Sequence, residues 1–183
     1  MSKKTVGILA GSLRRDSISR IIAGFFSELL SVRFDVCILD IAPLAMYNQD
    51  LDNGNDIPEE WKRFRAVVKG LDAVLFVTPE YNRSVPAVLK NALDIASRPY
   101  GANAWSGKPG AVVSVSPGAI GGFGANHHLR QTAACLNIRM MQQPEAYIGG
   151  IGSPADLENS SDFFHKFAEA FAEWIESPYT IFT

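Results

Sequence analysis

Cysteine is scarce in this chain, and the little that is present is not arranged for metal binding or redox chemistry. The two cysteines, Cys37 and Cys135, belong to no Cys-x-x-Cys motif and to no zinc or iron–sulfur spacing. Each lies in an apolar run, so we expect two small buried side chains and no disulfide. The adjacent His127 and His128 would point to different faces of a helix, so we also expect no metal site.

A surplus of basic charge is absent as well. Lysine and arginine total 17 against 19 for aspartate and glutamate, which gives a net charge of −2 at pH 7. Nucleic-acid binding proteins normally carry a basic face, so we expect no nucleic-acid partner. No apolar run approaches the roughly 20 residues that a membrane-spanning helix needs, and no signal-peptide cleavage pattern follows the first residues. We therefore expect a cytoplasmic protein without a membrane partner.

Two common nucleotide-binding motifs are also missing. The dinucleotide fingerprint Gly-x-Gly-x-x-Gly should follow the first apolar run, but only Gly11 is present there. The nearest approach to a P-loop runs from Gly101 to Lys108. It has one residue too many between its glycines, and Pro109 stands where Ser or Thr is needed. Neither a dinucleotide on a Rossmann half nor ATP on a P-loop is favoured.

Apolar runs typical of buried strands alternate with helical patterns along the chain. We expect strands over 5–10, 34–40, 73–78, 110–115 and 138–141, and helices over 17–32, 57–69, 85–97, 125–136 and 161–176. Right-handed crossovers then give an α/β fold, a doubly wound five-stranded parallel sheet with helices on both faces. With 183 residues and no linker, one domain spanning 1–183 in the flavodoxin-like strand order 2-1-3-4-5 is expected.

The loop after the first strand is rich in hydroxyl groups. It holds Ser12, Ser17 and Ser19 together with Arg14, and it leads directly into a helix. Helix N-terminal N–H groups favour anions, so this composition suits a phosphate monoester, above all that of flavin mononucleotide (FMN). A plain helix cap with its arginines in solvent is the alternative.

Two further loops should meet the first one, because ligands of such sheets bind where the strand order reverses. The backbone of Pro79–Asn82 would face the crevice and hold the edge of a flavin, with Tyr81 as a wall or simply as a surface aromatic. Glu80 lacks a carboxylate partner, so a structural role is favoured over a catalytic one. The glycine-rich stretch from Ser116 to Gly124 would let a planar ring approach the backbone, or would be a mobile turn.

The motifs taken together resemble the NAD(P)H-dependent FMN reductases, and within that family the chromate and quinone reductase branch. The similarity extends from about Val6 to Gly150. The residues that carry it are Gly11-Ser12-Leu13-Arg14 with Ser17, Thr78-Pro79-Glu80-Tyr81-Asn82, Ser84-Val85-Pro86, Leu89-Lys90-Asn91-Ala92, Gly107-Lys108-Pro109 and His128-Leu129-Arg130-Gln131.

The resemblance implies tightly but non-covalently bound FMN, with NADPH or NADH as the electron donor. The acceptor would be a small molecule: a quinone, an azo compound, free flavin or a metal oxyanion such as chromate. No side chain is expected to be catalytic, because the flavin carries the chemistry. A homodimer or homotetramer with flavin sites at a subunit interface is also implied. The cofactor-binding residues would be Ser12, Arg14, Ser17, Ile18, Ser19, Pro79, Glu80, Tyr81, Asn82, Ser116 and Gly118.

Two other functions are compatible with the same sheet. The first is a flavodoxin-type electron carrier without substrate turnover, although such carriers are usually strongly acidic and this chain has a net charge of −2. The second is a phosphate-binding hydrolase that uses no flavin.

Overall fold

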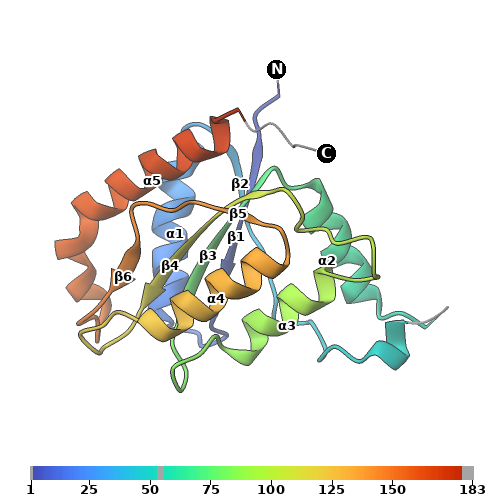
Figure 1. Cartoon of the computed structure of the whole chain (residues 1–183). Helices are drawn as coiled ribbons and strands as arrows, with labels where there is room; N and C mark the ends of the chain where they lie inside the picture. Colours follow the sequence, from blue (N-terminus) through green and yellow to red (C-terminus); the bar gives the residue numbers. More distant parts are fainter. Residues whose placement is uncertain (1, 53–55, 179–183) are drawn as a thin grey trace.

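A parallel sheet lies between two layers of helices (Figure 1). The computed structural model describes residues 2–52 and 56–178. Its principal strands are β1 (Thr5–Ala10), β2 (Asp35–Ile38), β3 (Ala73–Pro79), β4 (Pro109–Val115) and β5 (Arg139–Met140). They are hydrogen-bonded in the order β2-β1-β3-β4-β5, and every pair is parallel. The expected strand order is therefore confirmed.

A sixth strand, β6 (Ala146–Ile148), was not predicted. β5 pairs with the beginning of β4, whereas β6 pairs with its end, in the register Val113↔Ala146 to Val115↔Ile148. In the described residues, β5 and β6 together form one interrupted edge strand beside β4. A run of three residues is too short to show the alternation from which strands are recognised in a sequence. β6 extends this edge toward the loop that follows β4.

Five α-helices cover the sheet in the described part of the chain. They are α1 (Ile18–Ser31), α2 (Glu59–Gly70), α3 (Ala87–Ala96), α4 (Phe123–Cys135) and α5 (Ser161–Glu176), with 3-10 helices η1 (Gln49–Asp52) and η2 (Pro154–Ser160). Each predicted helix is confirmed, and its ends lie within two residues of the expected positions. Figure 1 shows α1 and α5 on one face and α2, α3 and α4 on the other. None of the helices in residues 2–52 and 56–178 has the length and apolar character to cross a membrane.

Both faces of the sheet are buried, and successive strand residues serve opposite faces. Leu75 and Val77 of β3 pack with α1 and α5, while Val74 and Phe76 pack with α2, α3 and α4. The aromatic stripe of residues 161–176 belongs to the first of these cores, as predicted. Its members Phe164, Phe167 and Phe171 are all buried there. A sheet covered on both faces leaves only the ends of its strands open to a ligand.

Neither cysteine is fully buried, although both were predicted to be. Cys37 is half-buried in β2, and burial raises the pKa of its thiol. Cys135, the last residue of α4, is exposed, so the prediction of a buried side chain was wrong there. Buried Ala133 lies two residues earlier, which is about 200° around the helix. Cys135 therefore points away from the core although its sequence neighbours are apolar.

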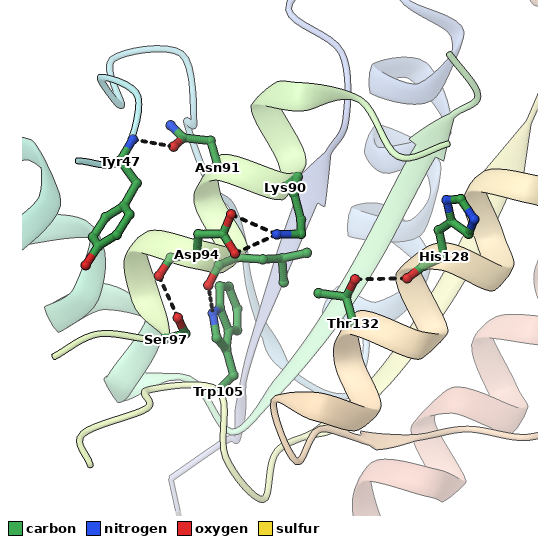
Figure 2. A network of polar contacts seen from close by, with 9 residues as sticks. Tyr47, Lys90, Asn91, Asp94, Ser97, Trp105, His128 and Thr132 are labelled. Atoms are coloured by element: carbon green, nitrogen blue, oxygen red, sulfur yellow. Dashed lines mark hydrogen bonds and ion pairs between the residues drawn. The ribbon is translucent and has the colours of Figure 1, made fainter. Parts of the chain in front are cut away.

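The connection between β2 and α2 is held in place by a side chain of α3. Asn91 accepts a hydrogen bond from the N–H of Tyr47 at 2.8 Å and donates to the carbonyl of Leu44 at 3.1 Å. Figure 2 shows the first of these contacts. Buried Asn91 thereby satisfies backbone groups of an irregular segment that has no ladder partners.

A bidentate ion pair anchors the end of the β2–α2 connection that lies nearer to α2. Both guanidinium NH groups of Arg65 in α2 lie 2.7 Å from the carboxylate oxygens of Asp52 in η1, and the side chains are only 13% and 4% exposed. Arg65 also donates from Nε to the carbonyl of Ile95 at 2.9 Å. The hydrogen bonds from Arg65 hold the pKa of Asp52 below its ordinary value, so the pair stabilises the ionised carboxylate.

We expect Asp52→Asn to lower the free energy of unfolding at neutral pH by about 1–3 kcal/mol, because Arg65 loses its charged partner. The Asp52 pKa is lower in the folded than in the unfolded state. Its contribution is therefore complete above the unfolded value of about 3.9 and is lost as the pH falls through the folded value. Urea unfolding at a series of pH values should show the difference from wild type shrinking in acid.

The matched control is Asp50→Asn in the same 3-10 helix, where the replaced side chain is exposed. This variant should unfold like the wild type at every pH. Equal losses in the two variants at pH 7 would contradict the assigned role of the Asp52–Arg65 pair.

Candidate functional site

Three loops leave the sheet side by side at the carboxyl ends of β1, β3 and β4. The register places Ala10 opposite Val77 and Pro79 opposite Val115, so β3 and β4 end together and β1 ends two residues before them. The N–H of Gly11 continues the pairing with a 2.8 Å bond to the carbonyl of Val77. The expected neighbourhood of the serine loop (residues 11–17), the Tyr81 loop (79–84) and the glycine loop (116–122) is therefore present.

The serine loop keeps its hydroxyl groups buried. Ser12, Ser17 and Ser19 are all buried, and the Ser17 and Ser19 Oγ atoms lie 2.8 Å apart. The N–H of Arg14 donates to Ser12 Oγ at 3.3 Å. Ser17 is the N-cap residue of α1, yet its side chain makes no cap hydrogen bond, and the first turn of α1 holds no acidic residue. The N-terminal dipole of α1 is thus left without a negative partner of its own.

Positive charge surrounds this loop. Arg14, Arg15 and Arg20 are exposed, and none of them forms an ion pair with a carboxylate in the described residues. Asp16 is the one acidic residue of the loop. Buried hydroxyl groups, an uncapped helix start and unpaired guanidinium groups together suit a dianionic phosphate.

The Tyr81 loop is a two-residue hairpin. Tyr81 and Ser84 exchange N–H to carbonyl hydrogen bonds at 3.1 and 3.0 Å, and Asn82 and Arg83 between them have φ values of 51° and 65°. Two left-handed residues in succession are the signature of a type I′ turn. The amide of Tyr81 is consumed inside the turn, while its ring is exposed near the tip. The hairpin therefore presents Tyr81 on a fixed backbone.

The side chain of Glu80 points to α4. Its Oε2 accepts a hydrogen bond from the N–H of Ala125 at 3.1 Å, and its Oε1 lies 3.2 Å from an NH group of Arg83. Both carboxylate oxygens are engaged within the protein. These contacts agree with a structural role for the side chain and leave its backbone as the part that can meet a ligand.

The glycine loop is fixed to the sheet. Buried Ser114 donates from Oγ to the carbonyl of Gly121 at 2.7 Å. Gly121 and Gly122 are left-handed, with φ values of 59° and 76°, and a Cβ on Gly121 would lie 2.4 Å from the backbone of Tyr147. Ser116, at the start of the loop, donates to the carbonyl of Gly118 at 3.1 Å. These contacts argue against the alternative of a freely mobile turn.

Two residues of α4 support these loops in roles that the sequence did not predict. Asn126 is fully buried and donates to Ser114 Oγ and to the carbonyl of Ala146, both at 3.2 Å. His128 Nδ1 lies 2.9 Å from Ser84 Oγ at the base of the hairpin. The available signal was an amide side chain in the predicted helix 125–136, one turn before the apolar Leu129. Among the described residues, no group of His, Cys, Asp and Glu could hold a metal ion.

A hollow of about 700 Å³ lies between α3 and α4. Val85, Lys90, Gln131 and Cys135 are among its lining residues. Lys90 Nζ is 2.8 Å from Asp94 on the next turn of α3, and Figure 2 shows this pair facing His128 and Thr132 of α4. The hollow adjoins the base of the Tyr81 loop and is separate from the serine loop.

Comparisons with known proteins agree with this geometry. A family model described as NADPH-dependent FMN reductase matches residues 4–152. A quinone reductase of Pseudomonas putida is 51% identical over 177 residues, covering 94% of this chain and 95% of that protein. A 2-hydroxy-1,4-benzoquinone reductase of a Burkholderia species is 42% identical over 176 residues, covering 93% and 95%.

Solved structures place the fold in the same group. FerB, a flavoenzyme NAD(P)H:(acceptor) oxidoreductase from Paracoccus denitrificans, superimposes with a TM-score of 0.87 at 41% identity, covering 94% of this chain and 97% of that one. A flavodoxin variant of Pseudomonas aeruginosa shares the fold at a TM-score of 0.62 and 20% identity. The family match and the relatives span most of the chain. The chain therefore belongs to the NADPH-dependent FMN reductase family and is an FMN-dependent NAD(P)H oxidoreductase.

Proposed function

We propose that the electron acceptor of this enzyme is a quinone. The observation that carries the proposal is the meeting of the serine loop, the Tyr81 loop and the glycine loop at one sheet edge. Exposed apolar side chains border that edge, namely Leu13, Tyr81, Ile120 and Phe123. Such side chains suit a planar apolar acceptor better than a small oxyanion. The names of the Pseudomonas putida and Burkholderia relatives agree with this acceptor class.

We propose a division of the cofactor site between phosphate and ring. The uncapped start of α1 and the buried serines fit the phosphate of FMN, held by Ser12, Arg14, Ser17, Ile18 and Ser19. The ring would lie against Pro79, Glu80, Tyr81, Asn82, Ser116 and Gly118, with Glu80 contributing its backbone. FMN held by these residues would supply the redox chemistry, namely hydride uptake from NADPH or NADH and electron transfer to the acceptor. In this proposal the protein binds and orients FMN, and Tyr81 forms one wall of the ring site. No catalytic side chain is required.

We also propose that the protein is a homodimer joined through the hollow between α3 and α4. Lys90, Asp94 and Arg98 line it with charges of both signs, which allows a two-fold related copy to be complementary. Tyr100, on the same rim, is 94% exposed. A dimer formed there would bring a second subunit against the base of the Tyr81 loop. The family resemblance also implies that two such dimers can associate into a tetramer.

We propose a cytoplasmic location, with which the two free thiols agree.

Protein loaded with FMN and mixed with NADPH in the absence of air should lose its visible flavin absorbance. Added 1,4-benzoquinone should then reoxidise the flavin and restore that absorbance. A protein that binds FMN but is not reduced by NADPH would be an electron carrier, and a protein that does not bind FMN would favour the hydrolase. Steady-state rates with quinones, azo dyes, free flavin and chromate test the acceptor, and a quinone that is slower than chromate would contradict the proposal.

We expect Arg14→Ala to weaken FMN binding by about 10- to 100-fold, because one charge-assisted contact to the phosphate is lost. Riboflavin lacks the phosphate, so its affinity should change much less. Fluorescence titration of the apoprotein measures both constants. Arg63→Ala, which removes an exposed positive charge from α2, is the control and should leave both affinities unchanged. An unchanged FMN affinity in Arg14→Ala would contradict the phosphate role.

The dimer proposal predicts that Cys135 reacts slowly with a thiol reagent in concentrated protein and faster after dilution, because the partner covers the hollow that it lines. Light scattering of the same samples measures the mass. Cys135→Ser should abolish the concentration-dependent phase and leave the slower half-buried Cys37. A monomer at all concentrations would contradict the proposal, as would a dimer in which Cys135 reacts at the rate of a free thiol.

A further inference from the structure

Helix α4 lacks a cap of its own. Its N-cap residue is Gly122, no side-chain cap bond is formed there, and its first turn holds no acidic residue. The missing carboxylate comes from another element, because Glu80 Oε2 accepts the N–H of Ala125, the third residue of the helix, at 3.1 Å. A carboxylate at this position satisfies an unpaired donor and complements the positive end of the helix dipole. The Glu80 side chain is only 11% exposed, which strengthens the contact.

The Tyr81 loop is attached to α4 at both of its ends. Glu80 stands immediately before the hairpin and binds Ala125, while Ser84 closes the hairpin and lies 2.9 Å from His128 Nδ1. Ala125 and His128 are one helical turn apart, so the two attachments lie on the same side of α4. The hairpin between them therefore has little freedom to move relative to the helix.

Gly124 allows this close approach. A Cβ on Gly124 would lie 2.7 Å from the carbonyl oxygen of Arg83 and 2.9 Å from Glu80 Oε2. The first of these is backbone and cannot rotate away. Gly124 lies within the first turn of α4, where glycine costs roughly 0.5–1 kcal/mol relative to alanine. Glycine occupies this position despite the cost in helix stability, because any larger side chain would clash with the hairpin.

We propose that Glu80, seated over Gly124, is a positioning residue that sets the height of the Tyr81 hairpin at the flavin ring. It acts through the hairpin rather than by proton transfer. The proposal rests on the proposed site, in which this hairpin borders the ring. Loss of the Glu80–Ala125 contact, or a side chain at position 124, would displace Tyr81 and Asn82 together and loosen the enclosure of the ring.

The first test is Gly124→Ala, with Gly24→Ala as the matched control. Gly24 is also inside a helix, α1, but apart from its chain neighbours and the backbone of its own helix no described atom lies within 4 Å of its Cβ position. We expect Gly124→Ala to weaken FMN binding about tenfold and to shift the reduction potential of bound FMN. Gly24→Ala should change neither quantity. Circular dichroism of both apoproteins monitors folding, and both should retain the helical signal of the wild type.

The second test compares Glu80→Gln with Glu80→Ala and remains informative if Gly124→Ala does not fold. Gln retains an oxygen that accepts the Ala125 N–H, so its FMN affinity should stay within about threefold of wild type, while Ala should lose about tenfold. If Glu80 were an acid catalyst, Gln would be as inactive as Ala and the pH profile of kcat would lose a limb. That result would overturn the proposal, as would unchanged FMN affinity and potential in both Gly124→Ala and Glu80→Ala. Failure of the wild type to bind FMN would instead refute the proposed site.

Discussion

Burial of the sheet on both faces is the constraint from which the rest of this structure follows. Side chains of β3 alternate between a core with α1 and α5 and a core with α2, α3 and α4, so neither face can receive a ligand. Because all paired strands are parallel, their carboxyl ends meet at one edge. The polar and glycine-rich segments lie in the loops of that edge, where backbone groups are not consumed by the ladder. The position of the site is a consequence of the strand order.

Helix α4 connects the Tyr81 loop and the glycine loop, which form the ring side of the proposed site. Asn126 reaches the glycine loop through Ser114 and reaches β6 through the carbonyl of Ala146. One residue earlier, the N–H of Ala125 donates to the carboxylate of Glu80 in the Tyr81 loop. The glycine loop, β6 and the Tyr81 loop are separate in the sequence but are all hydrogen-bonded, directly or through Ser114, to α4. Flavin chemistry depends on orientation more than on acid–base groups, so this shared attachment is a contribution to function.

Fold alone does not separate an enzyme of this kind from an electron carrier. The Pseudomonas aeruginosa flavodoxin shares the architecture at 20% identity, whereas the reductase relatives above 40% identity share the chain almost from end to end. Function depends on the site that a fold carries, not on the fold itself. Here an exposed tyrosine hairpin and Ile120 of the glycine loop border the proposed site, and the adjoining hollow between α3 and α4 is the surface that we propose for a second subunit.

The sequence by itself determined the alternation of strands and helices, the strand order and the three loops, because these depend on local periodicity and on short motifs. The tertiary structure decided the short strand β6, the exposure of Cys135 and the partners of Glu80 and Asn126. A strand of three residues carries no periodic signal, and the outward direction of Cys135 depends on which side of α4 meets the sheet. Glu80 and Ala125 are 45 positions apart. A contact over that separation exists only once the sheet has brought the two elements together, so no local pattern could reveal it.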